Sequence, residues 1–116
     1  MILSEAETAM RRDPEHWLIP FMDFVDDFRR SPHAVNIDQA PTTGSGRLDA
    51  LLASTVEYLC REQGCPAPAW VSTVPSCAEP WFVSGVENLK AMALAASPVD
   101  FRKRKIFVLE NFLSRV

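Results

Sequence analysis

The sequence predicts a mainly α-helical domain of four to five helices with a minor two-stranded β element at about 81–83 and 106–109. Apolar residues recur at helical spacing along two long stretches, residues 17–28 and 48–60. Signals for helix starts, such as a serine three residues before a glutamate, occur in both halves of the chain. Between the helical patterns, short aromatic and β-branched runs are typical of strands. Together these observations favour helices packed around one core.

Length and composition are those of one ordinary globular domain. The 116 residues are enough for a single core, and 47% of them are apolar and 23% charged. The net charge of −3 gives no general attraction to nucleic acid or to anionic membranes. We therefore expect a single helical domain, 1–116, with N-terminal helices (1–30), a loop (31–46) and a C-terminal module (47–116).

The sequence has no recognisable targeting or membrane segment. Its first ten residues include Glu5 and Glu7 in place of a basic start followed by an apolar run. The longest strictly apolar run, residues 91–96, is far shorter than the ~20 residues that a membrane-spanning helix needs. We expect a cytoplasmic protein with no membrane contact, and the odd number of cysteines fits reduced thiols.

A short first helix is predicted at about residues 5–12. Ser4 and Glu7 have the spacing of a capping box, in which two side chains satisfy backbone donors at a helix start. The helix should end before Pro14, because a residue that precedes a proline avoids helical dihedrals.

A second helix is predicted from Asp13 and Pro14, as cap and first residue, to Arg30. Pro20 lacks a backbone donor, so we expect one helical turn at 14–18, a kink, and then the main helix. An apolar face is formed by four aromatic residues, Trp17, Phe21, Phe24 and Phe28. Three acids beside it, Asp23, Asp26 and Asp27, fit either a metal or acid/base site or a solvated helix surface, and the second is favoured.

The middle of the chain contains the clearest helix. Residues 31–46 are rich in proline, glycine and small polar residues and predict a loop, with at most a short strand at 35–37. Residues 47–63 then form one apolar stripe at helical spacing, and Gly64 stands where a left-handed C-terminal cap belongs. Residues 65–79 contain three prolines, so extended chain is expected there.

Two further helix-start signals lie in the C-terminal part. Ser84 and Glu87 form a second capping box, ahead of a helix whose inward stripe is expected to be Val86, Leu89, Ala93 and Ala96. Ser97 and Pro98 then predict another helical turn, with Ser97 as its cap. Residues 111–116 are expected to form a short helical end.

No motif for a reaction or a metal centre is present in the sequence. The candidate ligands are three cysteines and two histidines, Cys60, Cys65, Cys77, His16 and His33. They lack the paired spacing of zinc ligands, and no nucleophile elbow or papain-like signature occurs. We therefore predict a protein that is not an enzyme and that uses no catalytic residue, cofactor or metal.

The strongest polar feature is the basic run Arg102, Lys103, Arg104 and Lys105. Four adjacent cations raise the local potential and fit contact with phosphates or with an acidic protein surface. They also fit a solvated turn whose charges complement the negative end of the preceding helix. Since consecutive helical residues point in different directions, the second interpretation is slightly favoured and both stay open.

From Gly46 onward, the order of motifs resembles a known family. The helix RLDALLA (47–53), the segment PAPAW (66–70), the turn PWF (80–82) and the ending SPVDFRKRKIFV (97–108) are similar, in this order, to the C-terminal region of small bacterial helix-turn-helix regulators, many of them actinobacterial. Members typically show an RLDALLAAL-like helix, a PAPAW segment, an RPWF turn and an SPAAFRRRNIFV-like ending. Trp81 and residues 97–108 are the most specific part of the resemblance.

The resemblance implies a role in binding a protein partner. Members are often encoded beside a nucleotidyltransferase-like protein, in the manner of toxin–antitoxin pairs, and are identified as antitoxin candidates. The DNA-reading helix-turn-helix that precedes the matching region in many members is absent from this sequence. The part of the family that this chain resembles is therefore the module that would hold the partner.

We predict a non-enzymatic protein-binding module, an antitoxin-like partner of a nucleotidyltransferase-type toxin. The expected contact residues are Trp81, Phe82, Phe101, Arg102, Lys103, Arg104 and Lys105, because aromatic residues and cations concentrate binding energy. Core packing is the favoured alternative for Trp81 and Phe82. The alternative function is a nucleic-acid-associated transcriptional regulator that acts through residues 102–105, and its binding would weaken steeply with salt.

Overall fold

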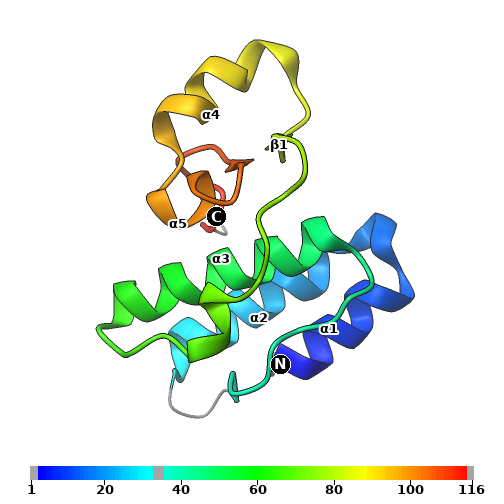
Figure 1. Cartoon of the computed structure of the whole chain (residues 1–116), viewed down its shortest axis with the longest axis vertical. Coiled ribbons are helices and arrows are strands. Elements are labelled where there is room, and N and C mark those ends of the chain that lie inside the picture. Colours follow the sequence, from blue (N-terminus) through cyan, green and yellow to red (C-terminus); the bar gives the residue numbers. More distant parts are fainter. Residues whose placement is uncertain (1–2, 33–35, 115–116) are drawn as a thin grey trace.

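The computed structural model describes residues 3–32 and 36–114, and the mainly helical fold with a small two-stranded sheet is confirmed. The α-helices are α1 (Leu3–Arg12), α2 (Leu18–Arg30), α3 (Gly46–Gln63), α4 (Lys90–Ala96) and α5 (Val99–Arg102). Short 3-10 helices occupy η1 (Pro14–His16), η2 (Ala69–Ser72) and η3 (Glu87–Leu89). The strands are β1 (Trp81–Phe82) and β2 (Ile106–Phe107), within the two predicted ranges (Figure 1).

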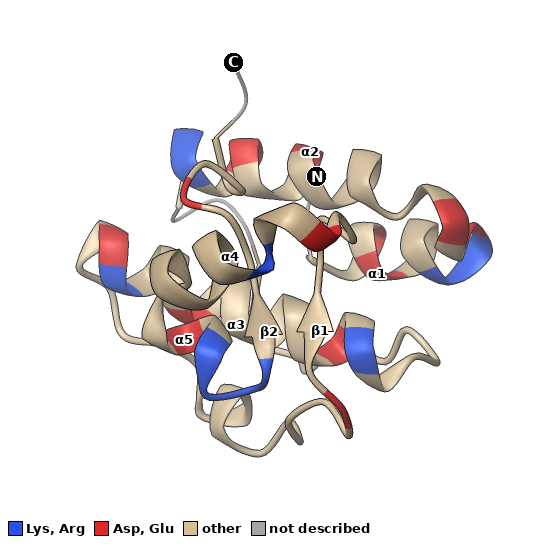
Figure 2. Ribbon diagram, turned by 90° about the horizontal axis from the view of Figure 1, so that it is seen from above, with Lys and Arg blue, Asp and Glu red and all other residues tan. Residues whose placement is uncertain are grey.

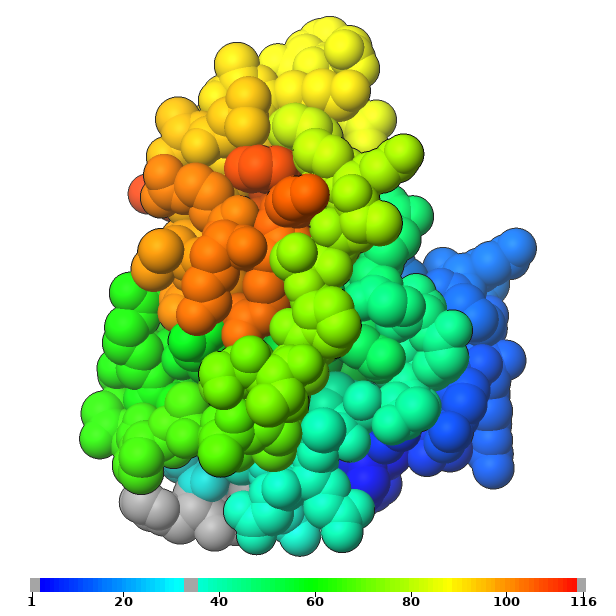
Figure 3. Space-filling model, in the orientation of Figure 1, coloured from blue at the N-terminus to red at the C-terminus, as the bar shows by residue number. Residues whose placement is uncertain are grey.

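The helices form two layers with α3 at their contact. Helix α2 contacts both α1 and α3, and the C-terminal part, residues 81–114, lies across α3 through α5 (Figure 1). Figure 3 shows this part, in yellow and orange, packed closely against the green middle part of the chain. One core cluster extends through both layers, and its largest fully buried side chains include Phe21, Phe24, Phe28, Leu51, Leu52, Leu59, Phe101 and Ile106. No helix in the described ranges is both long and apolar enough to cross a membrane.

Local chemistry sets both ends of α3. Ser45 is the N-terminal cap, and its side chain accepts a hydrogen bond of 3.4 Å from the backbone N–H of Leu48. Asp49, in the first turn, accepts bonds of 2.8 and 2.7 Å from the backbone and hydroxyl of Thr43. Gly64 ends the helix with a φ of 71°, in the left-handed region where a side chain would be strained. The predicted helix and its glycine cap are both confirmed.

The prediction of a capping box at Ser4 and Glu7 is wrong, although the predicted helix is present. Ser4 lies inside α1, and Glu7 accepts a bond of 2.7 Å from the backbone N–H of Thr42 in place of closing the helix start. The predicted break before the main helix falls at Trp17, between η1 and α2. Pro20 is therefore in the first turn of α2, where the first four N–H groups have no helical acceptor and a missing one costs little.

The helix predicted from Ser84 begins later than expected, and its cap is different. Gly85 has a φ of 68° and its N–H bonds to the carbonyl of Phe82, so the chain turns here before η3 and α4. Ser84 instead accepts a bond of 3.4 Å from the N–H of Val86, and Val86 is exposed where an inward position was expected. Of the predicted stripe, Ala93 is the buried member.

Ser97 joins two elements. It does not cap α5, although the sequence predicts that it does. Pro98 occupies the cap position, and Ser97 ends α4. The buried Ser97 hydroxyl donates to the carbonyl of Ala93 and accepts a bond of 2.8 Å from the N–H of Val108. This hydroxyl therefore holds the end of α4 against the chain that leaves β2.

The sheet is parallel and pairs Trp81 with Ile106 and Phe82 with Phe107. The chain beyond β2 ends in turns at residues 110–113 in place of the predicted helix, and 115–116 lie outside the described residues. The short strand considered at 35–37 is absent at Ile37, while Val35 lies outside the described residues. The carbonyl of Ile37 instead accepts a 2.8 Å bond from the indole of Trp70.

Candidate partner-binding surface

The predicted contact residues are divided between the interior and the surface. Figure 2 shows the basic run as a blue turn between α5 and β2. Phe101 is fully buried and Arg104 is 4% exposed, whereas Arg102, Lys103 and Lys105 are exposed. Phe101 and Arg104 therefore cannot touch a partner in this conformation, because other parts of the chain cover them.

Arg104 ties three segments together from inside the fold. Its guanidinium donates to the Glu57 carboxylate at 2.8 Å, to the Val71 carbonyl at 2.6 Å and to the Asp100 carbonyl at 2.9 Å. Ser54 of α3 lies 3.4 Å from the same group. Since Arg is the cation best suited to several hydrogen bonds in fixed directions, this residue fits a structural role.

The exposed part of the basic run is not a continuous cationic surface. Lys103 forms an ion pair of 2.8 Å with Glu57, and Arg102 donates to the carbonyl of Ser97 at 3.0 Å. Burial raises the pKa of the Glu57 carboxyl, but hydrogen bonds from Lys103 and Arg104 and their charges together lower it below its ordinary value. Three of the four cations thus bond to other parts of the chain, which weakens the case for phosphate contact through residues 102–105.

Trp81 and Phe82 are half-buried and point to opposite faces of β1. The Trp81 ring packs edge-on against Trp17 at 5.8 Å, and the Arg47 guanidinium lies 4.5 Å above it. The Phe82 ring stacks on Phe107 at 5.0 Å, with the Lys90 ammonium 5.1 Å from its centre. Both rings therefore pack inside the chain while keeping one part exposed, and partner contact through them stays a prediction.

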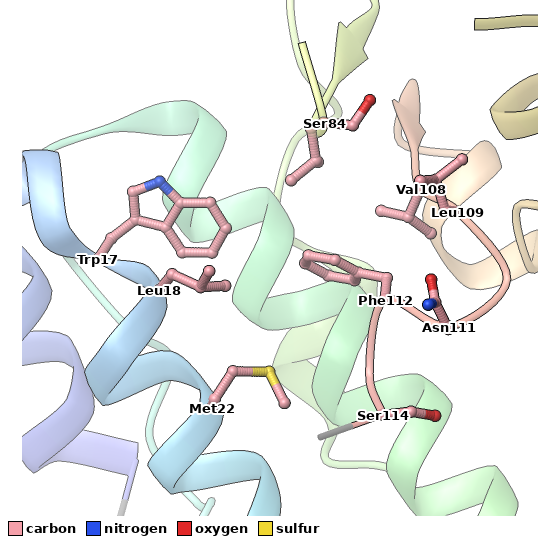
Figure 4. Close-up of a pocket in the computed structure, with 10 residues that line it drawn as sticks. Trp17, Leu18, Met22, Ser84, Val108, Leu109, Asn111, Phe112 and Ser114 are labelled. Carbon is pink, nitrogen blue, oxygen red and sulfur yellow. The ribbon is translucent and has the colours of Figure 1, made fainter. Parts of the chain in front are cut away.

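An apolar cleft of about 430 Å³ lies between the start of α2 and the C-terminal segment. Its lining consists of Trp17, Leu18, Met22, Val83, Ser84, Val108, Leu109, Asn111, Phe112 and Ser114. Figure 4 shows Trp17, Leu18 and Met22 on one side and Val108 and Phe112 facing them. Most of these side chains are apolar, and the polar ones, such as Asn111, are hydroxyl or amide groups without charge.

The core holds the walls of this cleft in place. Phe112 stacks on Phe21 at 5.7 Å and meets Phe101 edge-on at 6.2 Å. Trp17 packs edge-on against Phe21 at 5.5 Å. Arg29 of α2 also donates to the carbonyl of Leu113, which fixes the C-terminal segment beside α2. The cleft is thus a formed feature bounded by packed aromatic rings.

A second hollow, a groove beside α4, shares part of its lining with the cleft. This groove is lined by Met92, Ala95, Ala96, Leu109, Glu110, Asn111 and Ser114, three of which also line the cleft. Each hollow includes one large apolar side chain that is well exposed: Leu18 on α2 is 49% exposed, and Met92 on α4 is 60% exposed. Cleft and groove together form an apolar trough between α2 and α4, which is the candidate partner-binding surface.

None of the residues that line the trough was among the predicted contact residues. Leu18 and Met22 lie four residues apart on the apolar face of the second helix, so a helical pattern was the available signal. That pattern does not distinguish a side chain that meets the core from one that lines a cleft. Phe112 lies opposite α2 because the chain turns at 110–113, where a helix was expected.

The remaining chemistry of the described residues is modest. They contain no group of three His, Cys, Asp or Glu side chains that could hold a metal ion. His16 is exposed and bonds to Asp13 at 2.9 Å, and His33 lies outside the described residues. Burial raises the pKa of the Cys77 thiol, although the charges of Arg47 and Lys105 lower it in part.

A comparison with known proteins gives no match to a family model, to a curated protein or to a solved structure.

Proposed function

We propose that this chain is a non-enzymatic protein-binding module that takes an amphipathic helix of its partner into the trough between α2 and α4. The main observation in support is the apolar cleft of about 430 Å³ between α2 and the C-terminal segment, with the exposed side chain of Leu18 in its lining and that of Met92 in the groove beside α4. Contiguous exposed apolar surface has a cost in water, and proteins that retain it commonly cover it with a partner. The proposal assigns no catalytic residue.

An amphipathic helix is the occupant that suits this shape and chemistry. The trough is bounded on two sides by helices, its lining is mostly apolar, and the polar groups along it are uncharged except for Glu110. Helices that bind such grooves insert apolar side chains at helical spacing and leave their polar face in water. The antitoxin-like resemblance suggests that the helix belongs to a nucleotidyltransferase-type toxin, which this module would neutralise.

The proposal predicts that Leu18→Glu abolishes or weakens partner binding, whereas Val99→Glu does not. Leu18 and Val99 are each the first residue of a helix and are 49% and 54% exposed, and Leu18 lines the cleft while Val99 does not. A glutamate is tolerated at a helix start, so both variants should fold. Burying its charge in the cleft should weaken binding at least about tenfold. The measurement is calorimetry or co-purification with the product of the gene adjacent to the one that encodes this chain.

A third variant distinguishes partner binding in the trough from partner binding by the basic run. Lys105 is exposed, lies outside both hollows and belongs to the predicted contact set. Equal affinity of Lys105→Glu and the unaltered chain is expected if the partner docks in the trough alone. A loss with Lys105→Glu and none with Leu18→Glu would replace the trough by the basic run as the contact. If the unaltered chain does not bind the adjacent gene product at all, the toxin assignment is wrong.

A further inference from the structure

Two of the three cysteines stand on either side of the glycine that ends α3. The N–H of Cys65 donates to the carbonyl of Cys60 at 2.9 Å, and the N–H of Gly64 donates to the carbonyl of Arg61 at 3.3 Å. Gly64 itself adopts the left-handed conformation, with φ 71° and ψ 23°. This pair of bonds defines a Schellman motif, in which the side chains of the residues at the Cys60 and Cys65 positions commonly touch.

The thiols occupy these two positions with unequal exposure. Cys60 is 1% exposed and belongs to the core, while Cys65 is half-buried and packs against the same core. The Cys65 thiol lies near enough to the Cys60 thiol to raise its pKa. Cys77 is buried elsewhere, where its N–H bonds to the carbonyl of Arg104 before β1. The fold therefore places one solvent-accessible thiol beside one protected thiol and keeps the third apart.

We infer that Cys60 and Cys65 form a site of reversible oxidation, which closes an intramolecular disulfide when the protein meets a peroxide. A disulfide needs its two Cα atoms roughly 4.4–6.8 Å apart with the side chains directed at one another. The backbone bond between Cys65 and Cys60 keeps these residues next to each other, and the Schellman motif directs their side chains toward one another. Small side-chain rotations can then bring the sulfur atoms to bonding distance without unfolding α3.

The chemistry balances with hydrogen peroxide as the oxidant. The Cys65 thiol first releases its proton, and the thiolate attacks one peroxide oxygen. The O–O bond breaks, Cys65 becomes a sulfenic acid, and the hydroxide that leaves takes up the released proton to become water. The Cys60 sulfur then attacks the Cys65 sulfur, and the S–O bond breaks. The released hydroxyl takes the Cys60 proton and leaves as a second water. In total, two thiols lose two electrons and two protons, and one peroxide is reduced to two waters.

The unequal environments assign the order of these steps. Burial, followed by the hydrogen bond and charge of Cys65, raises the pKa of the Cys60 thiol to about 12, so Cys60 stays protonated and reacts second. Cys65 is accessible to solvent and reacts first. Because a protonated thiol is a weak nucleophile, closure of the disulfide should be slower than oxidation of Cys65. The product would lock the C-terminal end of α3.

The unaltered chain provides a direct test. The folded protein is treated with hydrogen peroxide, free thiols are blocked with N-ethylmaleimide, and a tryptic digest is analysed by mass spectrometry. Trypsin cleaves after Arg61, which lies between the two cysteines, so a Cys60–Cys65 disulfide joins two peptides. Because Cys65 and Cys77 share the tryptic peptide 62–90, fragmentation of the joined pair is used to locate the N-ethylmaleimide label on Cys77. The expected result is this joined pair, released by dithiothreitol, with Cys77 still free. Failure of any joined pair to form, a disulfide that includes Cys77, or oxidation of Cys65 to a sulfinic acid without a link would each overturn the inference.

Two single variants check the order of reaction. Cys65→Ser should leave Cys60 unreacted with peroxide, because its thiol is then covered and protonated. Cys77→Ser should form the Cys60–Cys65 disulfide at the same rate as the unaltered chain. Rapid oxidation of Cys60 in the Cys65→Ser variant would contradict the assignment of Cys65 as the first site of attack. Circular dichroism confirms that each variant is folded before it is tested.

Discussion

Arg104 and Lys103 bond to the same carboxylate from neighbouring positions, yet their surroundings differ. The Arg104 side chain is 5% exposed and that of Lys103 is 46% exposed. Arg104 also satisfies the carbonyls of Val71 and Asp100, which have little access to water, whereas Lys103 can exchange its partner for solvent. At the scale of single residues, burial and not charge separates the two roles.

Replacing each cation by methionine should therefore give unequal losses of stability. Arg104→Met leaves buried acceptors without donors and should lower the free energy of unfolding by about 2–4 kcal/mol. Lys103→Met removes a solvent-exposed ion pair and should cost less than about 1 kcal/mol. Urea denaturation followed by circular dichroism measures both. Similar small losses for the two variants would mean that water replaces the bonds of Arg104.

The sequence reveals the basic run but not which of its members is buried. Four consecutive cations contain no periodic signal, and the chain leaves the run through a left-handed turn at Lys105, whose φ is 63°. A positive φ is uncommon for a residue other than glycine, so composition alone does not predict it. The burial of Phe101 could have been predicted from helical spacing, since Phe101 stands three residues before Arg104 on the same face of the turn.

At the scale of elements, the sequence predicts a helix end correctly where the apolar pattern and the capping residue indicate the same helix. Gly64 and the apolar stripe of α3 both indicate the same helix, and both predictions are confirmed. Ser84 and Glu87 have the spacing of a cap, but Gly85 between them takes a left-handed turn and the chain does not become helical until Glu87. Tertiary contacts decide such cases, because Ser97 is likewise drawn from a cap position to the N–H of Val108.

Glu57 links α3 to the turn between α5 and β2, and this link should depend on pH. Burial raises the pKa of Glu57, but the bonds and charges of Lys103 and Arg104 outweigh it, so the folded pKa lies below the ordinary value of 4.5. The link is therefore fully present above pH 4.5 and is lost as the pH falls through the folded pKa. Glu57→Gln should remove this part of the acid destabilisation.

The measurement is the free energy of unfolding in urea at several pH values from neutral to acid. The slope of stability against pH below the ordinary Glu57 pKa should be shallower in Glu57→Gln than in the unaltered chain. Glu5→Gln is the matched control, because Glu5 is exposed on α1 and should leave the slope unchanged. Parallel curves for Glu57→Gln and the unaltered chain would show that Glu57 titrates alike in the folded and unfolded protein.

At the scale of the whole molecule, the sequence predicts the helical class and the two strands because both follow from periodicity and residue type. It does not predict the trough, which exists because α2 and the C-terminal segment stop short of closing against each other. The lining comes from residues up to 97 positions apart, Trp17 and Ser114, so no local pattern includes them. The sequence shows which side chains are apolar, but only the packing of the two layers shows that these side chains line one surface.

The two layers should unfold as one unit, because their core is continuous. Ile106 of β2 is fully buried in the same cluster as Phe21 and Leu51 from the other layer. Ile106→Ala should therefore destabilise the whole chain by about 2–5 kcal/mol and lower the urea midpoint seen by helical circular dichroism and by tryptophan fluorescence equally. Val99→Ala, at an exposed position of α5, is the control and should shift neither midpoint by a measurable amount. If Ile106→Ala separates the circular dichroism transition from the fluorescence transition, the C-terminal layer unfolds independently of the helices beneath it.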